Sequence, residues 1–243
     1  MDYFDAYGEA ARRLSKPTLI SGRNSFQVEQ EKHIVNDVFA KLLPSPSDRL
    51  LEIGCGVGVL LTPLAKLVKE AVGIDHPACI EKYVALGKPS NVRLIAGRWP
   101  EAGVDGQFDR ILVYSVLHIL PDADTARSFI RACLDALAPG GRLMLGDIPN
   151  EDSIRRFKNS EFGKKFHAEY LKRTASLQED EKTSRQRDIF ANVDRHTPHL
   201  TDDFMLDLLT VTRKNGCESY IVPQPQELQF AYTREDILIC KRW

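Results

Sequence analysis

Residues 50–61 have the sequence LLEIGCGVGVLL, in which an apolar run meets one acid, Glu52, and then three glycines in five positions. Glycine tolerates backbone conformations that other residues avoid and has no Cβ to keep a ligand away. An apolar strand that ends in such a loop, before an apolar helix, places the loop at the carboxyl edge of a parallel sheet, where open α/β folds bind ligands. The stretch therefore predicts an α/β fold with a ligand site at residues 54–58.

Strands and helices alternate along most of the chain. Apolar runs predict strands over 49–55, 70–75, 91–97, 108–116 and 142–149, and helical spacing predicts helices over 26–43, 59–70, 78–86, 122–137 and 201–216. Nearly continuous apolar strands indicate a parallel sheet covered by helices on both faces. The cluster at 138–141, APGG, is a helix stop and turn. The last two strands, 217–223 and 235–242, have only a loop between them and should pair antiparallel.

Glu52 narrows the choice of ligand for the glycine loop. An unpaired buried acid is costly, so dinucleotide-binding strands usually carry an apolar residue there. A ligand that brings a cation or an amine to the loop would explain the acid. An NAD-dependent oxidoreductase is the competing enzyme class, and Asp75 would suit its ribose. Glu52, the GxGxG spacing and the PGG turn speak against it.

The spacing EIGCGVG resembles motif I of the class I S-adenosylmethionine-dependent methyltransferases, [DE]-x-G-x-G-x-G. The resemblance continues in AVGID, whose Asp75 follows Gly58 by 17 residues, in FDRILVYSVLHIL and in LAPGGRLML. It implies a Rossmann-like seven-stranded sheet, mostly parallel with an antiparallel last strand, with helices on both faces and a helical lid insertion. It also implies an enzyme that uses S-adenosyl-L-methionine, releases S-adenosyl-L-homocysteine and needs no metal.

The resemblance implies a set of cofactor-binding residues in this sequence. Glu52 would meet the amino-acid end of the cofactor and Asp75 the ribose hydroxyls. The family often has an acid where Arg98 stands, so adenine recognition would rest on the backbone and packing near Trp99. The full expected set is Glu52, Gly54, Cys55, Gly56, Gly58, Asp75, His76, Gly97, Arg98, Trp99, Ser115 and Val116.

Three parts are expected in the chain: an N-terminal helical cap over 1–47, a cofactor-binding domain over 48–149 and 201–243, and a lid or substrate insertion over 150–200. The insertion is too long for a simple connection between a strand and a helix. Residues 155–173 hold seven basic residues against two acidic ones, a local charge of +5. The segment is either a solvated amphipathic helix or a lid that neutralises an anionic substrate.

The sequence predicts the methyl acceptor less specifically than the cofactor. No NPPY or DPPY tetrad follows the fourth strand, which argues against adenine or glutamine as the acceptor. A small metabolite is then the default, and the basic insertion favours an anionic one that is methylated on oxygen. A small amine acceptor, or a protein that binds the cofactor without turnover, is the alternative. The catalytic candidates are His118, Asp147 and His167, and the substrate-binding candidates are Tyr7, Arg155, Arg156, Lys164 and Lys165.

The composition excludes several other classes. The net charge is −1 and the basic segment has little aromatic interleaving, so neither nucleic acid nor a membrane surface is an expected partner. Five scattered cysteines without a CxxC pair indicate reduced thiols rather than disulfides or zinc. A cytoplasmic location is expected, and a homodimer is left open.

Overall fold

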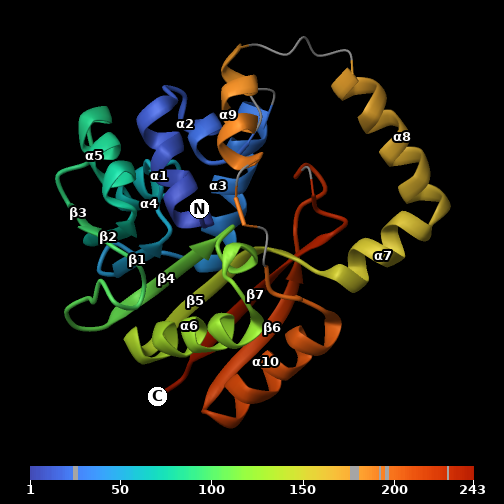
Figure 1. Cartoon of the computed structure of the whole chain (residues 1–243). Helices are drawn as coiled ribbons and strands as arrows, with labels where there is room; N and C mark the ends of the chain where they lie inside the picture. The colour runs from blue at the N-terminus through green and yellow to red at the C-terminus, as the bar shows by residue number, and fades with distance from the viewer. Residues whose placement is uncertain (24–26, 176–180, 192, 195–196, 229) are drawn as a thin grey trace.

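A computed structural model describes residues 1–23, 27–175, 181–191, 193–194, 197–228 and 230–243. Its centre is a seven-stranded sheet with the order β3-β2-β1-β4-β5-β7-β6 (Figure 1). The strands are β1 (Arg49–Ile53), β2 (Glu70–Asp75), β3 (Val92–Ala96), β4 (Phe108–Tyr114), β5 (Leu137–Pro149), β6 (Cys217–Pro223) and β7 (Arg234–Lys241).

The pairing of the strands confirms the predicted fold class. β1 pairs parallel with both β2 and β4, and β2–β3 and β4–β5 are also parallel. β7 runs antiparallel to both of its neighbours, β5 and β6. The chain order reverses between β1 and β4, because β2 and β3 lie on one side of β1 and β4 on the other. Such a reversal opens a crevice at the carboxyl ends of the strands, and the glycine loop follows β1 there.

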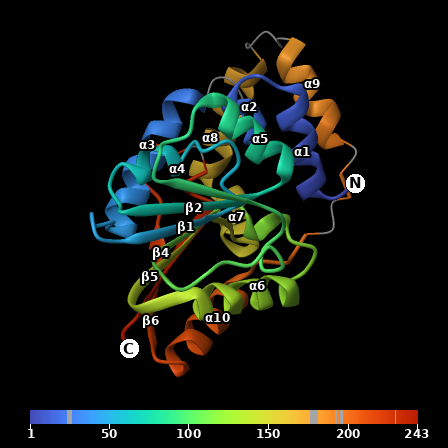
Figure 2. The same ribbon diagram turned by 90° about the vertical axis from the view of Figure 1, so that its left-hand side faces the viewer.

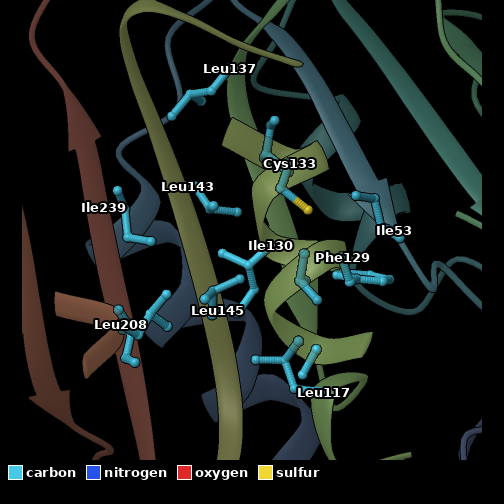
Figure 3. Close-up of a cluster of buried hydrophobic side chains, with 14 of the residues drawn as sticks. Ile53, Leu117, Phe129, Ile130, Cys133, Leu137, Leu143, Leu145, Leu208 and Ile239 are labelled. Carbon is cyan, nitrogen blue, oxygen red and sulfur yellow. The ribbon is translucent and has the colours of Figure 1, made fainter. Parts of the chain in front are cut away.

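One face of the sheet is covered by α6 (Ala123–Ala136) and α10 (Asp202–Lys214). Asp122 caps α6 by accepting from the backbone N–H of Thr125. Ala126, Phe129, Ile130 and Cys133 then follow at helical spacing and are buried. They meet Leu143 and Leu145 of β5 in the core cluster that Figure 3 shows.

The opposite face is covered by α3 (Val28–Leu42), α4 (Leu61–Ala65) and α5 (Pro77–Leu86). Leu50, Leu112 and Met144 point to this face, whereas Leu51, Ile111 and Leu143, one residue away in each strand, point to the other. Figure 2 shows the resulting three layers, with α6 and α10 below the sheet and α3, α4 and α5 above it.

Two predicted elements differ from the structure. The helix predicted over 59–70 is wrong in length, because α4 spans Leu61–Ala65 and β2 already begins at Glu70. The backbone N–H groups of Lys69 and Glu70 donate hydrogen bonds to the Asp48 carbonyl, so the chain rejoins the sheet soon after the helix ends. The turn expected at 138–141 lies inside β5 as a bulge, since Leu137 pairs with Phe108 but Arg142 with Arg110.

The insertion between β5 and α10 consists of two parts. Its last part, α9 (Glu181–Ala191), packs with α1 (Tyr3–Arg13) and α2 (Pro17–Ile20) around a third apolar cluster that includes Ala6, Leu19 and Ile189. Its first part, α7 (Glu151–Asn159) and α8 (Glu161–Ala175), projects away from the sheet (Figure 1). We call α7 and α8 the arm and α1, α2 and α9 the cap.

Candidate active site

The glycine loop after β1 is shaped by its glycines. Gly54, Gly56 and Gly58 all have positive φ, at 81°, 54° and 83°. A Cβ on Gly58 would lie 2.1 Å from the Tyr83 ring, and a Cβ on Gly54 would lie 2.5 Å from Val116 Cγ2. Around Gly56 there is open space instead. Gly54 and Gly58 therefore allow close packing beneath the loop, and Gly56 keeps its upper side bare.

A cavity of about 350 Å³ lies over this loop, between the sheet edge and the cap. Its size falls within the range of small-molecule sites, about 300–1,000 Å³. It is lined by the expected cofactor residues Glu52, Gly54, Cys55, Gly56, Asp75, Gly97, Arg98, Trp99, Ser115 and Val116. Gly58 and His76 are not in this lining: Gly58 packs on Tyr83, and the His76 ring caps α5 by accepting from Ala78 N.

Glu52 is the unusual group in the cavity. It is the next-to-last residue of β1, it is 3 % exposed, and its Oε2 is buried without a hydrogen-bond partner among the described residues. Burial raises the pKa of Glu52 well above its usual value, and the neighbouring Asp75 carboxylate adds to the rise. A buried carboxyl oxygen without a partner is costly, and a cationic ligand in the cavity would satisfy it. The cavity thus fits a ligand with an amino group.

Asp75 ends β2 beside the glycine loop. Its Oδ2 accepts from Gly56 N at 2.6 Å and its Oδ1 accepts from His76 N at 2.6 Å. Burial raises the pKa of Asp75, against the lowering effect of these two N–H groups. A carboxylate offers about four lone-pair positions, so each oxygen can still accept from a ligand hydroxyl.

The cap closes the cavity from above. Arg98 donates to Asp2 at 2.6 Å and lies over the Phe4 ring at 4.1 Å, which ties the loop after β3 to α1. Trp99, the next residue, packs against the core and has its Nε1 3.4 Å from the Phe129 carbonyl oxygen. The Arg98 side chain is therefore engaged by the cap rather than free to receive an adenine.

A second cavity, of about 130 Å³, adjoins the first. The two share Tyr7, Ser21, Arg23, Tyr114 and Ser115 as lining residues. The catalytic candidates His118 and Asp147 line the second cavity. Removal from water raises the pKa of Tyr7 to about 12, so its hydroxyl stays protonated between the two cavities.

Ser115 and Asp147 meet where the two cavities join. They follow β4 and lie near the end of β5, and the Ser115 hydroxyl donates to Asp147 Oδ2 at 2.5 Å. Both have left-handed backbones, with φ of 58° and 60°. Two hydrogen bonds to β7 fix the Asp147 backbone: its N–H donates to Asp236 Oδ1 at 2.8 Å, and its carbonyl accepts from Arg234 at 2.9 Å. Strain of this kind costs about 1–3 kcal/mol per residue and gathers at functional sites.

His118 lies in the short 3₁₀ helix η2 (Leu117–Ile119). Its Nδ1 is buried and has no partner among the described residues. Burial, with a smaller contribution from the Arg234 charge, lowers the pKa of His118 to about 4. The ring is therefore neutral at neutral pH and offers the second cavity an uncharged ring nitrogen.

The other expected residues lie elsewhere. His167, Lys164 and Lys165 are exposed on the arm, and Arg155 and Arg156 pair with Asp152 and Asp202. None of the five lines either cavity. The side chain of Arg173, the last cation of the basic segment, is outside the described residues.

Two arginines in the second cavity, Arg23 and Arg234, were not expected from the sequence. Arg23 follows α2 and Arg234 begins β7, so only the folded chain brings them together. Asp236, which holds the Asp147 amide, is fully buried and bonded to Lys41 of α3 at 2.6 Å. No local motif surrounds any of these residues, so periodicity and spacing could not single them out.

Comparisons with known proteins agree with this geometry. Residues 27–184 match a family described as methyltransferase domain. The chain is 31 % identical over 116 residues to a ubiquinone biosynthesis O-methyltransferase of Xanthomonas axonopodis pv. citri, covering 46 % of this chain and 47 % of that protein. It is also 36 % identical over 116 residues to chondramide synthase cmdD of Chondromyces crocatus, covering 45 % of this chain and 3 % of that one. The match thus spans less than half of each relative's length.

Among solved structures, the N-methyltransferase NodS from Bradyrhizobium japonicum, in complex with S-adenosyl-L-homocysteine, has a TM-score of 0.61. It is 18 % identical, and the superposition covers 98 % of this chain and 99 % of that one. The likeness shows that the fold is the class I S-adenosylmethionine-dependent methyltransferase fold. The chain belongs to the methyltransferase family, as the motifs around Glu52 and Asp75 predicted.

Two further observations concern the described residues alone. They contain no group of three or more histidine, cysteine or acidic side chains placed to hold a metal ion. None of their helices is both long and apolar enough to span a bilayer.

Proposed function

We propose that this chain transfers a methyl group from S-adenosyl-L-methionine to an oxygen of a small, anionic metabolite. The observation that carries the proposal is the buried, unpartnered carboxyl oxygen of Glu52 in a cavity over the glycine loop. A second, polar cavity next to it contains a strained aspartate and provides room for the acceptor. The match to O-methyltransferases among the relatives supports methylation on oxygen.

The residues of the first cavity fit the cofactor. Glu52 would accept from its ammonium group, because its buried Oε2 has no hydrogen-bond partner among the described residues. Asp75 would accept from the ribose hydroxyls with the lone pairs that Gly56 and His76 leave free. The bare side of Gly56 would lie against the ligand. Residues 48–149 and 201–243 would form the cofactor-binding domain, whose part of the cavity lining comes from 48–149, and 1–47 would cover the cofactor.

S-adenosyl-L-methionine supplies a methyl group on a positively charged sulfur, which is a good leaving group. The protein has to align the acceptor oxygen, remove its proton and keep water away. Asp147 is the proposed base, because its carboxylate lies at the junction of the cavities and its backbone is fixed on both sides. Ser115 orients that carboxylate through its 2.5 Å hydrogen bond. His118 can accept a hydrogen bond from the acceptor without becoming charged.

The first test is binding. Titration calorimetry with S-adenosyl-L-homocysteine should give a one-to-one complex with the wild-type chain. Absence of binding would remove the basis of the proposal.

The second test is Asp147→Asn, assayed with an acceptor found by screening small hydroxy acids for a methylated product. Removal of a general base should lower kcat by roughly 100- to 10,000-fold. The affinity for S-adenosyl-L-homocysteine should stay within about twofold, because Asp147 does not line the first cavity. Wild-type turnover in this variant would eliminate Asp147 as the base.

A further inference from the structure

The second cavity is lined by two guanidinium groups that form only some of the hydrogen bonds they can donate. The side chains of Arg23 and Arg234 are each 18 % exposed. In Arg23, Nη1 lies 3.1 Å from Ser21 Oγ and 3.7 Å from Glu31 Oε1. In Arg234, Nη1 donates to the Asp147 carbonyl at 2.9 Å and lies 3.4 Å from its Oδ2. Nε and Nη2 of both make no hydrogen bond with any described residue. Such largely buried donors favour a ligand that carries acceptor oxygens.

The two cavities differ in the charges that line them. Glu52 and Asp75 line the first cavity, together with Arg98, which is paired with Asp2, and Arg23, which the two cavities share and whose charge opposes the rise in the pKa of Glu52. The second is lined by two guanidiniums and one carboxylate, Asp147. Glu31 is outside this lining, and its Oε1 lies 3.7 Å from Arg23 Nη1; burial raises the pKa of Glu31, and the Arg23 charge opposes the rise. The first cavity is suited to a cation, and the second to an anion.

The rest of the second cavity is lined by polar groups, among them Gln27 and Gln224, and by one apolar patch. Ile34 and Leu228 are buried there, and the Phe230 ring lies beneath the Arg234 guanidinium, with its centre 5.3 Å from Cζ. A cavity of about 150 Å³ can hold a benzene molecule, so about 130 Å³ admits a group close to the size of one ring or a short branched chain. The reacting end of the acceptor is therefore compact and partly apolar.

The cations of the arm are poorly placed to bind the anionic group of the acceptor. Arg155 lies 2.5 Å from Asp152, and Arg156 is paired with Asp202. The arm projects away from the body (Figure 1). The anion-binding role expected of the arm thus has a better candidate in Arg23 and Arg234.

We infer that the acceptor is a small hydroxy acid with a compact apolar body, whose carboxylate is bound by Arg23 and Arg234 and whose hydroxyl faces Asp147. The inference rests on the proposed function and specifies the acceptor of the same site. A planar carboxylate matches the planar fork of a guanidinium, with two parallel N–H···O bonds. The hydroxyl is required because Asp147 and His118 supply acceptors rather than charged donors to the same cavity.

The experiment compares benzoate with benzamide, which has the same shape without the charge. Each is titrated into the chain saturated with S-adenosyl-L-homocysteine, with binding followed by protein NMR. We expect benzoate to bind at least tenfold more tightly than benzamide. Arg23→Gln and Arg234→Gln should each weaken benzoate binding tenfold or more and leave benzamide unchanged. Arg155→Gln, on the arm, is the matched control and should change neither.

Several results would overturn the inference. Equal affinities for benzoate and benzamide would show that the cavity does not recognise a carboxylate. If inorganic phosphate bound more tightly than benzoate, the group recognised by the two arginines would be a phosphate and not a carboxylate. Loss of benzoate binding in Arg155→Gln would move recognition to the arm. In all three cases retained S-adenosyl-L-homocysteine binding would leave the proposed function standing, whereas loss of that binding in the wild type would overturn both.

Arg234 also supports the Asp147 backbone, so its glutamine variant could disturb the fold. Arg234→Lys keeps the charge and removes the fork, and it should also weaken benzoate binding more than tenfold. Arg23 donates no side-chain hydrogen bond to Asp147 and tests the same cavity independently. Unchanged benzoate affinity in both Arg23→Gln and Arg234→Lys would contradict the inference.

Discussion

Among single residues, Glu52 shows the conflict between stability and function most directly. The fold buries its carboxyl group in a cavity without giving Oε2 a partner among the described residues. Its pKa is raised by burial and by the Asp75 carboxylate. The free chain therefore carries an acid that its surroundings disfavour as an anion, and a cationic ligand would reverse that preference.

The variant Glu52→Gln should separate the effect of the buried acid on stability from its effect on ligand binding. Because the pKa of Glu52 is raised in the folded chain, the native state holds the proton more tightly than the unfolded state. Stability is then lost as the pH rises above the ordinary glutamate value of 4.5, towards the raised value. Glutamine does not ionise, so the variant should have a higher Tm than the wild type at pH 8, with the difference shrinking towards pH 4.

The same variant should bind S-adenosyl-L-homocysteine roughly 10- to 100-fold more weakly, since a charge-assisted hydrogen bond contributes about 1.5–3 kcal/mol. Thermal unfolding with and without the ligand measures both effects. The exposed Glu81→Gln is a control that should alter neither. A lower Tm for ligand-free Glu52→Gln at pH 8, or undiminished affinity, would contradict this account.

At the scale of elements, the loop between β1 and α4 depends on glycines for two different reasons. Gly58 has a positive φ and packs under the Tyr83 ring, whose hydroxyl lies 2.7 Å from Thr62 Oγ1. Gly56 has a positive φ but no atom within 4 Å of its missing Cβ. The first glycine is required by packing and backbone, and the second by backbone alone.

Gly58→Ala should therefore destabilise the fold by about 2–5 kcal/mol, the sum of a left-handed alanine and an overpacked ring. Gly56→Ala should cost only about 1–2 kcal/mol, from the backbone. Urea unfolding of both variants measures the difference. Equal losses of stability would show that the Tyr83 contact does not limit this position.

The elements also show how far sequence reasoning reaches. β2 was predicted at its observed bounds because its six residues form an apolar run that ends in Asp75. The helix at 59–70 was predicted too long because the residues after Ala65 remain compatible with a helix. The helix ends at Ala65 because the chain turns back to the sheet there, with Lys69 N and Glu70 N bonded to the Asp48 carbonyl, which no local pattern shows. Local pattern thus predicts that an element exists, and tertiary pairing fixes its ends.

At the scale of the whole molecule, the candidate site has one part that local sequence patterns predict and another that only the tertiary fold assembles. Most of the residues expected at the cofactor line the first cavity, because Glu52 and Asp75 lie at the ends of β1 and β2 and Gly54 and Gly56 directly follow β1. The second cavity joins Arg23, Asp147 and Arg234, which come from three remote segments. The arm was predicted to bind the anion because its seven cations lie within 19 residues of the sequence, whereas Asp202, which pairs with Arg156, is 46 residues away. Charge density along the sequence could not show that pairing.

The arm itself has few stabilising contacts. None of the described large apolar side chains of α8 is buried, and Phe162 is 54 % exposed. The rings of Phe157, Phe162 and Phe166 gather around Tyr232 at the base of the arm. α10, by contrast, buries Phe204, Met205 and Leu208 against the sheet.

Amide hydrogens of α8 should consequently exchange faster than those of α10 by at least two orders of magnitude, because sparse burial lowers the free energy of local opening. Hydrogen exchange followed by mass spectrometry measures both helices in one experiment. Protection of α8 equal to that of α10 would show that the arm packs against something in solution, such as a second copy of the chain.

The hydrogen-bond network around Lys41 links α3 to β7 and β5 beside the second cavity. Lys41 of α3 lies 2.6 Å from both Asp37 and the fully buried Asp236 of β7. Asp236 in turn accepts from the Asp147 amide and from Gln224 Nε2. One ammonium group thus compensates two carboxyl groups, and burial raises the pKa of Asp37 even so.

Lys41→Met should destabilise the chain by about 3–5 kcal/mol, because removal of one partner leaves the buried carboxylates without a cation. The exposed Lys66→Met is the matched control and should stay within about 0.5 kcal/mol of the wild type. Urea unfolding gives both values. If Lys41→Met were as stable as Lys66→Met, Asp236 would not depend on Lys41, and α3 would have no part in holding Asp147 at the cavity.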